Sequence, residues 1–477
     1  MPFTIRLLPL AAALALAGCG TLAPTYERPA APVAQAWPQG PGYAADPSSE
    51  APLPSWQDFF TDGKLRQVIE LALANNRDLR IAALNIEQAR AQYRISRAAL
   101  LPNVGASGSG DHARTTPGIP GTGQRADEAL VGHGYNAAIG VGYELDLFGK
   151  VRSANEAALN QFFATEEARR SVELSLVASV ADTWLLYAAG QAQVDLAKTT
   201  LASQEASYQL ILRSHELGVA STLELRQAQT TVESARVDLA RATRAVAQVA
   251  NTLVLLAGGP VDESLLPAAG AVAASVVPAL PAGVPSEVLL RRPDIAQAER
   301  QLRAANAQIG VARAAFFPSI TLSAGGGRSS ADLNELFSGG ATYVWSWAPS
   351  INLPIFQGGA LTAQLESTKA AREIALAQYE KSIQTAFREV ADALATRGTI
   401  EAELEAQRAL AQAATEAYQL SEQRFRSGLD NYLAVLVAQR QMVTAQQALI
   451  QVEQARASSL VQLYKALGGG VTTQAAG

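Results

Sequence analysis

The sequence contains few of the side chains that support catalysis, metal binding or disulfide bonding. Of its 477 residues, one is cysteine, two are methionine and three are histidine. A single cysteine excludes a disulfide framework within the chain and a cysteine-based metal site. The histidines, His112, His133 and His215, are far apart in the sequence and lack metal-ligand spacing. No Gly-x-Ser-x-Gly elbow and no phosphate-binding lysine loop is present. These absences argue against an enzyme and against a resident metal or cofactor.

Charged and aromatic residues are also scarce. Charged residues make up 17% of the chain and the net charge is -5, with no basic cluster, so nucleic acid is not an expected partner. Aromatics make up 6%, and alanine supplies much of the apolar content. The most apolar internal stretch, residues 265–284, is interrupted by three prolines and does not predict a transmembrane helix. If the chain crosses a membrane, it must therefore do so as strands.

The N-terminal sequence predicts a lipoprotein. Residues 7–17 are apolar but too few to span a bilayer, and the lipobox LAGC follows at 16–19. Removal of residues 1–18 would leave Cys19 with an S-diacylglycerol and an amide-linked acyl chain, which together give stable anchorage. Gly20 stands where an inner-membrane lipoprotein has aspartate, so the outer membrane is expected. The alternative is an ordinary signal peptide that contains a cysteine.

The chain repeats itself at a nearly constant offset. The sequence RAALLP at 97–102 returns 216 positions later as RAAFFP at 313–318, and LGV at 217–219 returns 210 positions later as SGL. Landmarks in the same order at nearly one offset indicate an internal duplication. The expected parts are a lipidated N-terminal segment at 19–63, repeat 1 at 64–260, a linker at 261–285, repeat 2 at 286–470 and a tail at 471–477.

Long helices are predicted in both repeats. Apolar residues at steps of three and four form a heptad seam from Leu225 to Leu256, and the second copy interrupts this pattern only at Arg456 and Ser459. Glycines that end helical runs predict hairpin tips at about 216–222 and 426–432. On the helices alone, an ordinary helical bundle is the alternative. The seam residues are Leu225, Ala228, Val232, Ala235, Leu239, Ala242, Val246, Val249, Leu253 and Leu256.

Two alternating segments predict membrane strands. In residues 134–148, every second side chain is apolar and would face lipid, while Glu144 and Asp146 would face water in a lumen. Residues 342–355 alternate likewise, and their aromatic side chains are typical of an interfacial girdle. These aromatics are Tyr343, Trp345 and Trp347.

Shorter partner strands are expected at about 103–111 and 319–326, which leaves the polar stretches 111–133 and 325–341 as outward loops. Four strands cannot close a barrel around a lumen, whereas three copies supply twelve. The alternative is a set of soluble hairpins packed on helices.

Several motifs together resemble the TolC-type outer membrane factor family, and most closely its OprM-like lipoprotein branch. They are LAGC at 16–19, WQDFF at 56–60, NRDL at 76–79, YELDLFG at 143–149, RRPDI at 291–295, AAFFP at 314–318 and YKALGGG at 464–470. The resemblance covers essentially the whole mature chain. It implies a mixed fold, with a membrane β-barrel and a long α-helical coiled-coil barrel, in which a homotrimer forms a 12-stranded barrel and a 12-helix periplasmic tunnel.

The same resemblance implies a function. The protein would be the outer membrane exit duct of a tripartite efflux system, with a periplasmic adaptor and an inner-membrane transporter of the resistance-nodulation-division type as partners. Drugs and other small toxic compounds are the expected cargo, and metal-ion efflux or type I protein secretion are alternatives for the same duct. An outer-membrane lipoprotein enzyme and a structural scaffold are alternatives of a different class.

The resemblance further implies a gate at the periplasmic end. By position, Leu433 would form an inward apolar ring and Arg440 would make an inter-helix polar contact. Val437 departs from the family's pattern, because related channels carry an aspartate there. A valine ring would close by apolar contact, with less cation preference. Glu224 and Asp430 are the remaining acids near the tips, and Glu224 is equally well placed to complete a capping box with Ser221.

The hairpin tips would dock the adaptor. The residues expected there are Gly218 with Val219 and Gly428 with Leu429, and ordinary turn chemistry explains these glycines whether or not docking occurs. Arg292-Pro293-Asp294 is interpreted as a helix start, because proline and aspartate both favour the first turn.

Overall fold

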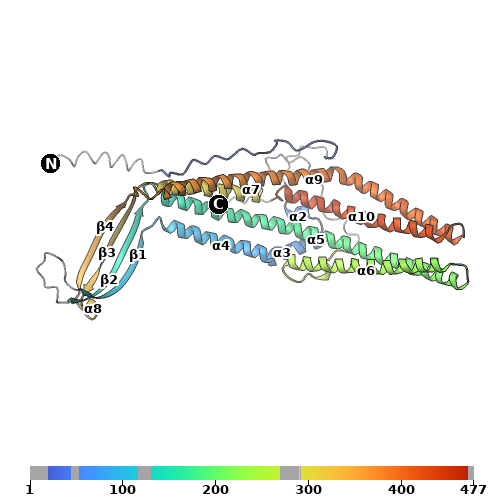
Figure 1. Ribbon diagram of the computed structural model, residues 1–477, viewed down its shortest axis with the longest axis horizontal. Helices are drawn as coiled ribbons and strands as arrows, with labels where there is room; N and C mark the ends of the chain where they lie inside the picture. Colours follow the sequence, from blue (N-terminus) through green and yellow to red (C-terminus); the bar gives the residue numbers. More distant parts are fainter. Residues whose placement is uncertain (1–19, 44–52, 116–129, 269–288, 290–291, 471–477) are drawn as a thin grey trace. The chain divides into compact units, whose positions relative to one another are not determined.

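The computed structural model describes residues 20–43, 53–115, 130–268, 289 and 292–470 (Figure 1). The predicted signal peptide, Cys19, most of the predicted linker and the C-terminal tail lie outside these residues. The chain divides into two compact units, each assembled from three segments. The first consists of Met1–Pro29, Ile86–Thr165 and Ala298–Gln378, and the second of Ala30–Asn85, Glu166–Gln297 and Tyr379–Gly477.

One order of elements occurs twice along the chain: a helix, two strands and two long helices (Figure 1). Among the described residues, two short helices precede the first set, a 3-10 helix follows it, and the short helix α8 lies between the two strands of the second set. The elements are α2 (Trp56–Phe59), α3 (Gly63–Asn75), α4 (Arg77–Ala98), β1 (Asn103–Thr115), β2 (Leu130–Leu145), α5 (Lys150–Glu216), α6 (Thr222–Ala257), η1 (Glu263–Leu265), α7 (Pro293–Ala314), β3 (Ser319–Ser330), α8 (Glu335–Ser338), β4 (Thr342–Asn352), α9 (Ala360–Arg426) and α10 (Tyr432–Ala466).

The first unit contains a four-stranded antiparallel sheet in the order β1-β2-β3-β4. The strands extend further than the sequence indicates: β1 continues to Thr115, β2 begins at Leu130 and β3 continues to Ser330. The prediction that residues 111–115, 130–133 and 325–330 are loop was therefore wrong. Ladder hydrogen bonds join backbone groups, so a strand can continue through polar residues and glycines that carry no apolar pattern.

An extended N-terminal segment also belongs to the first unit and lies along α7. The Asn306 side chain donates to the Pro24 carbonyl at 2.7 Å, and Arg313 donates to the Leu22 carbonyl at 3.0 Å. Gly310 faces this segment, and a Cβ there would approach the Ala23 nitrogen to 2.8 Å. Only glycine allows so close an approach of the two backbones.

Glu299, whose carboxylate is largely buried, holds the same segment through an ion pair with the half-exposed Arg28. Arg28 donates to both carboxylate oxygens of Glu299 at 3.2 and 2.7 Å, and Arg303 donates at 2.7 Å from one turn along α7. Burial alone would raise the pKa of Glu299, but the hydrogen bonds from Arg28 and Arg303 outweigh it and lower the pKa. The carboxylate therefore remains charged at neutral pH and holds the segment in place.

In the second unit, α6 packs through the predicted seam. None of its ten seam residues is exposed, and Ala228, Val232 and Leu253 are among the buried ones. Near the C-terminal end of α10, Phe59 stacks on Tyr464 with ring centroids 4.0 Å apart, and the Tyr464 hydroxyl donates to the Pro54 carbonyl. These contacts place the WQDFF and YKALGGG motifs in one core. Both motifs are therefore explained by packing.

Asn76 joins two helices in the second unit. Its side-chain oxygen accepts from the Asp78 and Leu79 amides, which caps α4, and its amide donates to the Leu256 carbonyl at the end of α6. Gly258 has φ 72° and packs so closely on Asn75 that a Cβ would lie 2.3 Å from the Asn75 carbonyl oxygen. The NRDL motif thus provides both a cap and an inter-helix contact.

By length and composition, α5 is long and apolar enough to cross a membrane, which the sequence reading did not anticipate. However, 56% of its most apolar window is buried inside the protein. Trp184 is fully buried there and donates to the Leu265 carbonyl at 3.2 Å. These apolar residues therefore pack against the protein's own helices.

Candidate functional site: the sheet and the helical tips

The two faces of the sheet differ in chemistry because the strands pair in register. One row across the sheet is Val104, Val141, Ala324 and Trp347, and the next is Ala106, Ile139, Gly326 and Trp345. Rows of the opposite parity hold small or polar residues. One of them is Gly105, Gly140, Gly325 and Ser346, and another is Ser109, Asn136, Ser329 and Thr342. Successive side chains point to opposite faces, so the sheet has one apolar face and one polar face.

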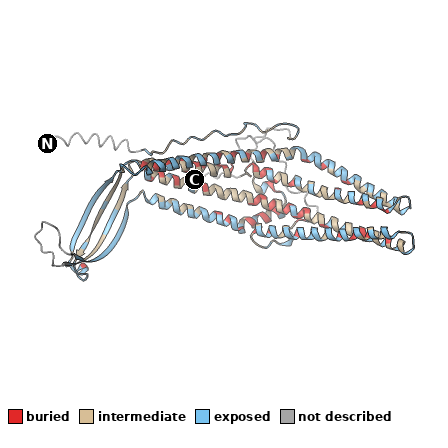
Figure 2. Cartoon of the chain, viewed as in Figure 1, coloured by how far each residue is buried: buried red, intermediate tan, exposed pale blue. Residues whose placement is uncertain are grey.

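The described residues leave most of the apolar face uncovered. Ile139 is 60% exposed and Trp345 is 73% exposed, and every residue of β4 is exposed (Figure 2). The outer edges of β1 and β4 have no strand partner among the described residues. An apolar face and two open edges on one sheet are an aggregation hazard in water, so such a sheet needs cover on this face and at these edges.

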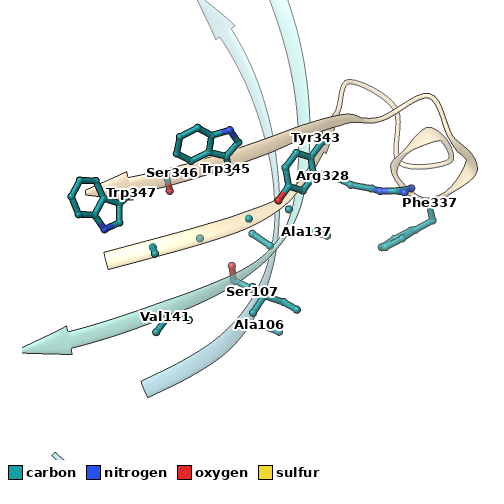
Figure 3. Close-up of a pocket in the computed structure, with 16 residues that line it drawn as sticks. Ala106, Ser107, Ala137, Val141, Arg328, Phe337, Tyr343, Trp345, Ser346 and Trp347 are labelled. Carbon is teal, nitrogen blue, oxygen red and sulfur yellow. The ribbon is translucent and has the colours of Figure 1, made fainter. Parts of the chain in front are cut away.

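The predicted aromatic girdle lies on this face. Tyr343, Trp345 and Trp347 occupy alternate positions of β4 and follow one another along the strand in Figure 3. They border an open hollow over the small residues of β2 and β3, with Arg328 and Phe337 toward its far end. Large aromatics beside a stripe of glycines leave room for apolar chains from outside the protein.

Glu144 lies on β2 as predicted, whereas Asp146 lies beyond the end of the strand, and a lumen-facing role for the two acids stays a prediction. Glu144 lies on β2 and pairs with Lys150 at 3.1 Å. Asp146 lies beyond the end of β2, where its carboxylate accepts from the Val151 and Arg152 amides at the start of α5. The chain leaves the strand after Leu145, so the alternation no longer applies, and Asp146 serves the helix N-terminus.

The first helical tip connects α5 with α6. Gly218 has φ 77°, and the Val219 amide donates to the Ser214 carbonyl at 2.8 Å, which closes the end of α5. Ser221 and Glu224 form a complete capping box at the start of α6. The capping role of Glu224 is therefore confirmed. Val219 is 81% exposed.

The second tip connects α9 with α10 by a related turn. Gly428 has φ 73°, and the Leu429 amide donates to the Arg424 carbonyl at 2.9 Å. Here the Asn431 side chain caps α10. The Arg424 guanidinium donates to both carboxylate oxygens of Asp430, at 2.6 and 3.1 Å. These hydrogen bonds from Arg424 lower the pKa of Asp430, so this acid is already neutralised by a neighbour on its own chain.

Replacing Gly428 with alanine is expected to destabilise the second tip by about 1–2 kcal/mol, because a Cβ is strained in the left-handed conformation. No atom lies within 4 Å of the added Cβ, so the loss would come from the backbone alone. Gly63→Ala is the matched control, since Gly63 also has open space but no positive φ. Urea unfolding followed by helical circular dichroism tests this, and equal midpoints for the two variants would contradict it.

Two faces of α10 behave differently beside the second tip. Tyr432 and Val435 are buried in a cluster with Ile211 and Ala228, which joins the two hairpins. Leu433 and Val437 lie one turn apart on another face and are 53% and 38% exposed. In a single chain, the apolar side chains of these two predicted gate residues are therefore exposed to solvent.

The predicted inter-helix contact of Arg440 is not made within the chain. Arg440 is exposed and pairs with no described residue, whereas its neighbour Gln439 is buried and donates to the Ser203 hydroxyl at 3.4 Å. Gln439, one position before Arg440, therefore makes the polar contact between helices of one chain. A contact of Arg440 with another copy stays a prediction.

Arg292 is a key residue whose contacts the sequence did not reveal. Its side chain is 8% exposed and donates to Asp294 at 3.0 and 2.8 Å, to Glu389 at 2.9 Å and to the Ala466 carbonyl at 2.7 Å. Burial opposes the charge, but the carboxylates outweigh this effect and raise the pKa of Arg292. One guanidinium therefore joins the start of α7, the middle of α9 and the end of α10.

The sequence pattern of the family described as "Outer membrane efflux protein" matches residues 68–259 and again 284–469. The chain belongs to this family. Among its similar relatives is TtgC of Pseudomonas putida, a probable efflux pump outer membrane protein. The two sequences are 49% identical over 461 residues, which cover 96% of this chain and 94% of TtgC. OprJ of Pseudomonas aeruginosa is 43% identical over 460 residues, covering 96% and 94%.

Solved structures agree with this membership. A membrane protein of Pseudomonas aeruginosa superposes with a TM-score of 0.84 at 42% identity, covering 94% of this chain and 98% of that one. The open state of the MtrE outer membrane channel of Neisseria gonorrhoeae superposes with a TM-score of 0.81 at 38% identity, covering 94% and 98%. The fold is therefore that of the outer membrane channels, with mixed helices and sheet, and its place is the outer membrane.

Proposed function

We propose that three copies of this chain form the outer membrane exit duct of a tripartite efflux pump. The observation that carries the proposal is the sheet, whose apolar face is exposed and whose two edges are open. Three such sheets joined edge to edge make a twelve-stranded barrel with the apolar face in lipid and the polar face around a lumen. The duct is a passive conduit, and a role in transport rather than catalysis accords with the family.

The long helices form the periplasmic part of the duct. Six helix pairs from three chains, α5 with α6 and α9 with α10, supply a twelve-helix tunnel. The tips at Val219 and Leu429 suit docking of a periplasmic adaptor, since both residues are apolar and are 81% and 67% exposed. The adaptor links the duct to an inner-membrane transporter of the resistance-nodulation-division type. Two matches of one family pattern along the chain support the internal duplication.

The lipid on Cys19 is a further part of the proposal. Gly20 and Thr21 lie against Gly149, where a Cβ would approach Thr21 to 2.7 Å, so the described chain begins beside the junction of β2 and α5. Acyl chains on the preceding residue would then enter the same membrane leaflet as that end of the barrel. Mass spectrometry of the purified protein would detect them.

The cargo is assigned from the relatives. Their names describe a toluene efflux pump, an antibiotic efflux pump and a solvent efflux pump. Drugs and other small organic toxicants are therefore the proposed cargo. Deletion of the gene is expected to lower resistance to organic solvents and antibiotics, and lower resistance to copper or silver alone would favour the metal-ion alternative.

The duct itself is tested with the purified protein. We expect heat-sensitive trimers that conduct ions in planar bilayers. A water-soluble monomer without conductance would overturn the proposal, whatever the cargo.

A further inference from the structure

Two of the three histidines meet on neighbouring strands. His112 on β1 lies directly opposite His133 on β2 in the register, and their Nδ1 atoms are 2.5 Å apart. The two histidines are 21 residues apart in the sequence, but the antiparallel pairing of β1 and β2 places them directly opposite each other. Both side chains are exposed to the outside of the chain.

A tyrosine orients one of the two rings. The Tyr135 hydroxyl lies 3.1 Å from Nε2 of His112, and the two rings meet edge to face. Tyr135 is two residues from His133 on the same strand, so it shares the face of the pair. With Nε2 engaged by the phenol, Nδ1 is the nitrogen of His112 left to face His133. Metal-binding histidines are commonly held in this way by a partner on the second nitrogen.

The surroundings place the pair away from the polar face. His112 and His133 have the same parity as Val104 and Ile139, so they lie at the far end of the apolar face. Asp111 points to the opposite face, where its carboxylate lies beside Gly134. No group of three or more potential ligands exists among the described residues, so two imidazoles and solvent must form any coordination shell here.

We propose that His112 and His133 bind one divalent transition-metal ion, of the class that includes Zn²⁺, Ni²⁺ and Cu²⁺. Imidazole nitrogen suits these ions, and waters complete the shell. Each ligand comes from a different strand, so the ion links β1 to β2 at the end of the hairpin that they form. Tyr135 is a positioning residue that holds the His112 ring. The site lies outside the path of the cargo and goes beyond the proposed duct function.

The experiment is calorimetric titration of Zn²⁺ into the full-length protein in detergent, without a histidine tag. Wild-type protein is expected to bind one ion per chain, and His112→Ala and His133→Ala are each expected to weaken binding at least about tenfold. His215→Ala is the matched control and should bind as wild type, because His215 lies in the last turn of α5 with its Nε2 beside the Thr222 hydroxyl. Tyr135→Phe should lower affinity about tenfold without changing the stoichiometry.

Thermal unfolding of the sheet, followed by circular dichroism, separates metal binding from misfolding. Zn²⁺ should raise the unfolding temperature of wild type and His215→Ala, and leave His112→Ala and His133→Ala unchanged, because only a ligand of the native state stabilises it. Variants that unfold like wild type without Zn²⁺ are correctly folded. Absence of saturable binding by wild type, or equal binding by His112→Ala, would overturn the proposal.

Discussion

Replacing Leu433 with glutamate is expected to open the predicted gate at the periplasmic end of the duct. In the proposed trimer, three copies of this exposed side chain form one apolar ring, and the substitution places three carboxylates in it. Charges about 8 Å apart repel by about 0.5–2 kcal/mol per pair, depending on the local dielectric. Since about 1.4 kcal/mol is a factor of ten in an equilibrium, the open population should rise at least about tenfold. Single-channel recording in planar bilayers would show this as higher mean conductance.

The repeat supplies the control for this experiment. Leu223, at the equivalent position of the first hairpin, is 67% exposed, so Leu223→Glu adds the same charge beside the other tip. If closure depends on the second hairpin, only Leu433→Glu should increase conductance strongly. Val437→Asp is a companion variant that introduces the acid that the family resemblance predicts at this position, and it should increase cation preference. Unchanged conductance and unchanged leakage in Leu433→Glu would remove Leu433 from the gate.

Patterns that repeat along one element could be predicted from the sequence. Alternation of side chains located the strands that carry Tyr143 and Trp345, because a strand with one apolar face has a period of two. Steps of three and four located the seam of α6 for the corresponding reason. The capping box of Ser221 and Glu224 was also predictable, since both halves of the interaction lie within one helical turn.

Contacts between distant segments could not be predicted in this way. The pairing of His112 with His133 depends on the register of two strands, which the polar residues at their ends do not define. Asp146 has the parity of a strand residue, but the position where β2 ends decides its role. Arg440 and Gln439 are neighbours in sequence, and only the packing of α10 shows which of the two is buried.

Removing the Arg292 side chain is expected to have the largest effect on the stability of the second unit. Arg292→Ala leaves Asp294, Glu389 and the Ala466 carbonyl without their shared donor. Asp294 and Glu389 are 38% and 39% exposed, so their charges regain water when the guanidinium is removed, and the cost stays below that of a fully buried pair. A loss of about 1.5–3 kcal/mol is expected from the broken charged hydrogen bonds. Urea unfolding monitored by helical circular dichroism should show a correspondingly lower free energy of unfolding.

Arg388→Ala is the matched control, because Arg388 is 71% exposed and lies 4.0 Å from Asp392 on the same helix. An exposed pair of this kind is worth at most about 0.5 kcal/mol, so this variant should unfold nearly as wild type. Arg292→Lys should lie between the two, since an ammonium group keeps the charge but cannot donate as a planar fork. Equal losses in Arg292→Ala and Arg388→Ala would mean that helix-surface charge, and not the buried junction of three helices, determines the stability.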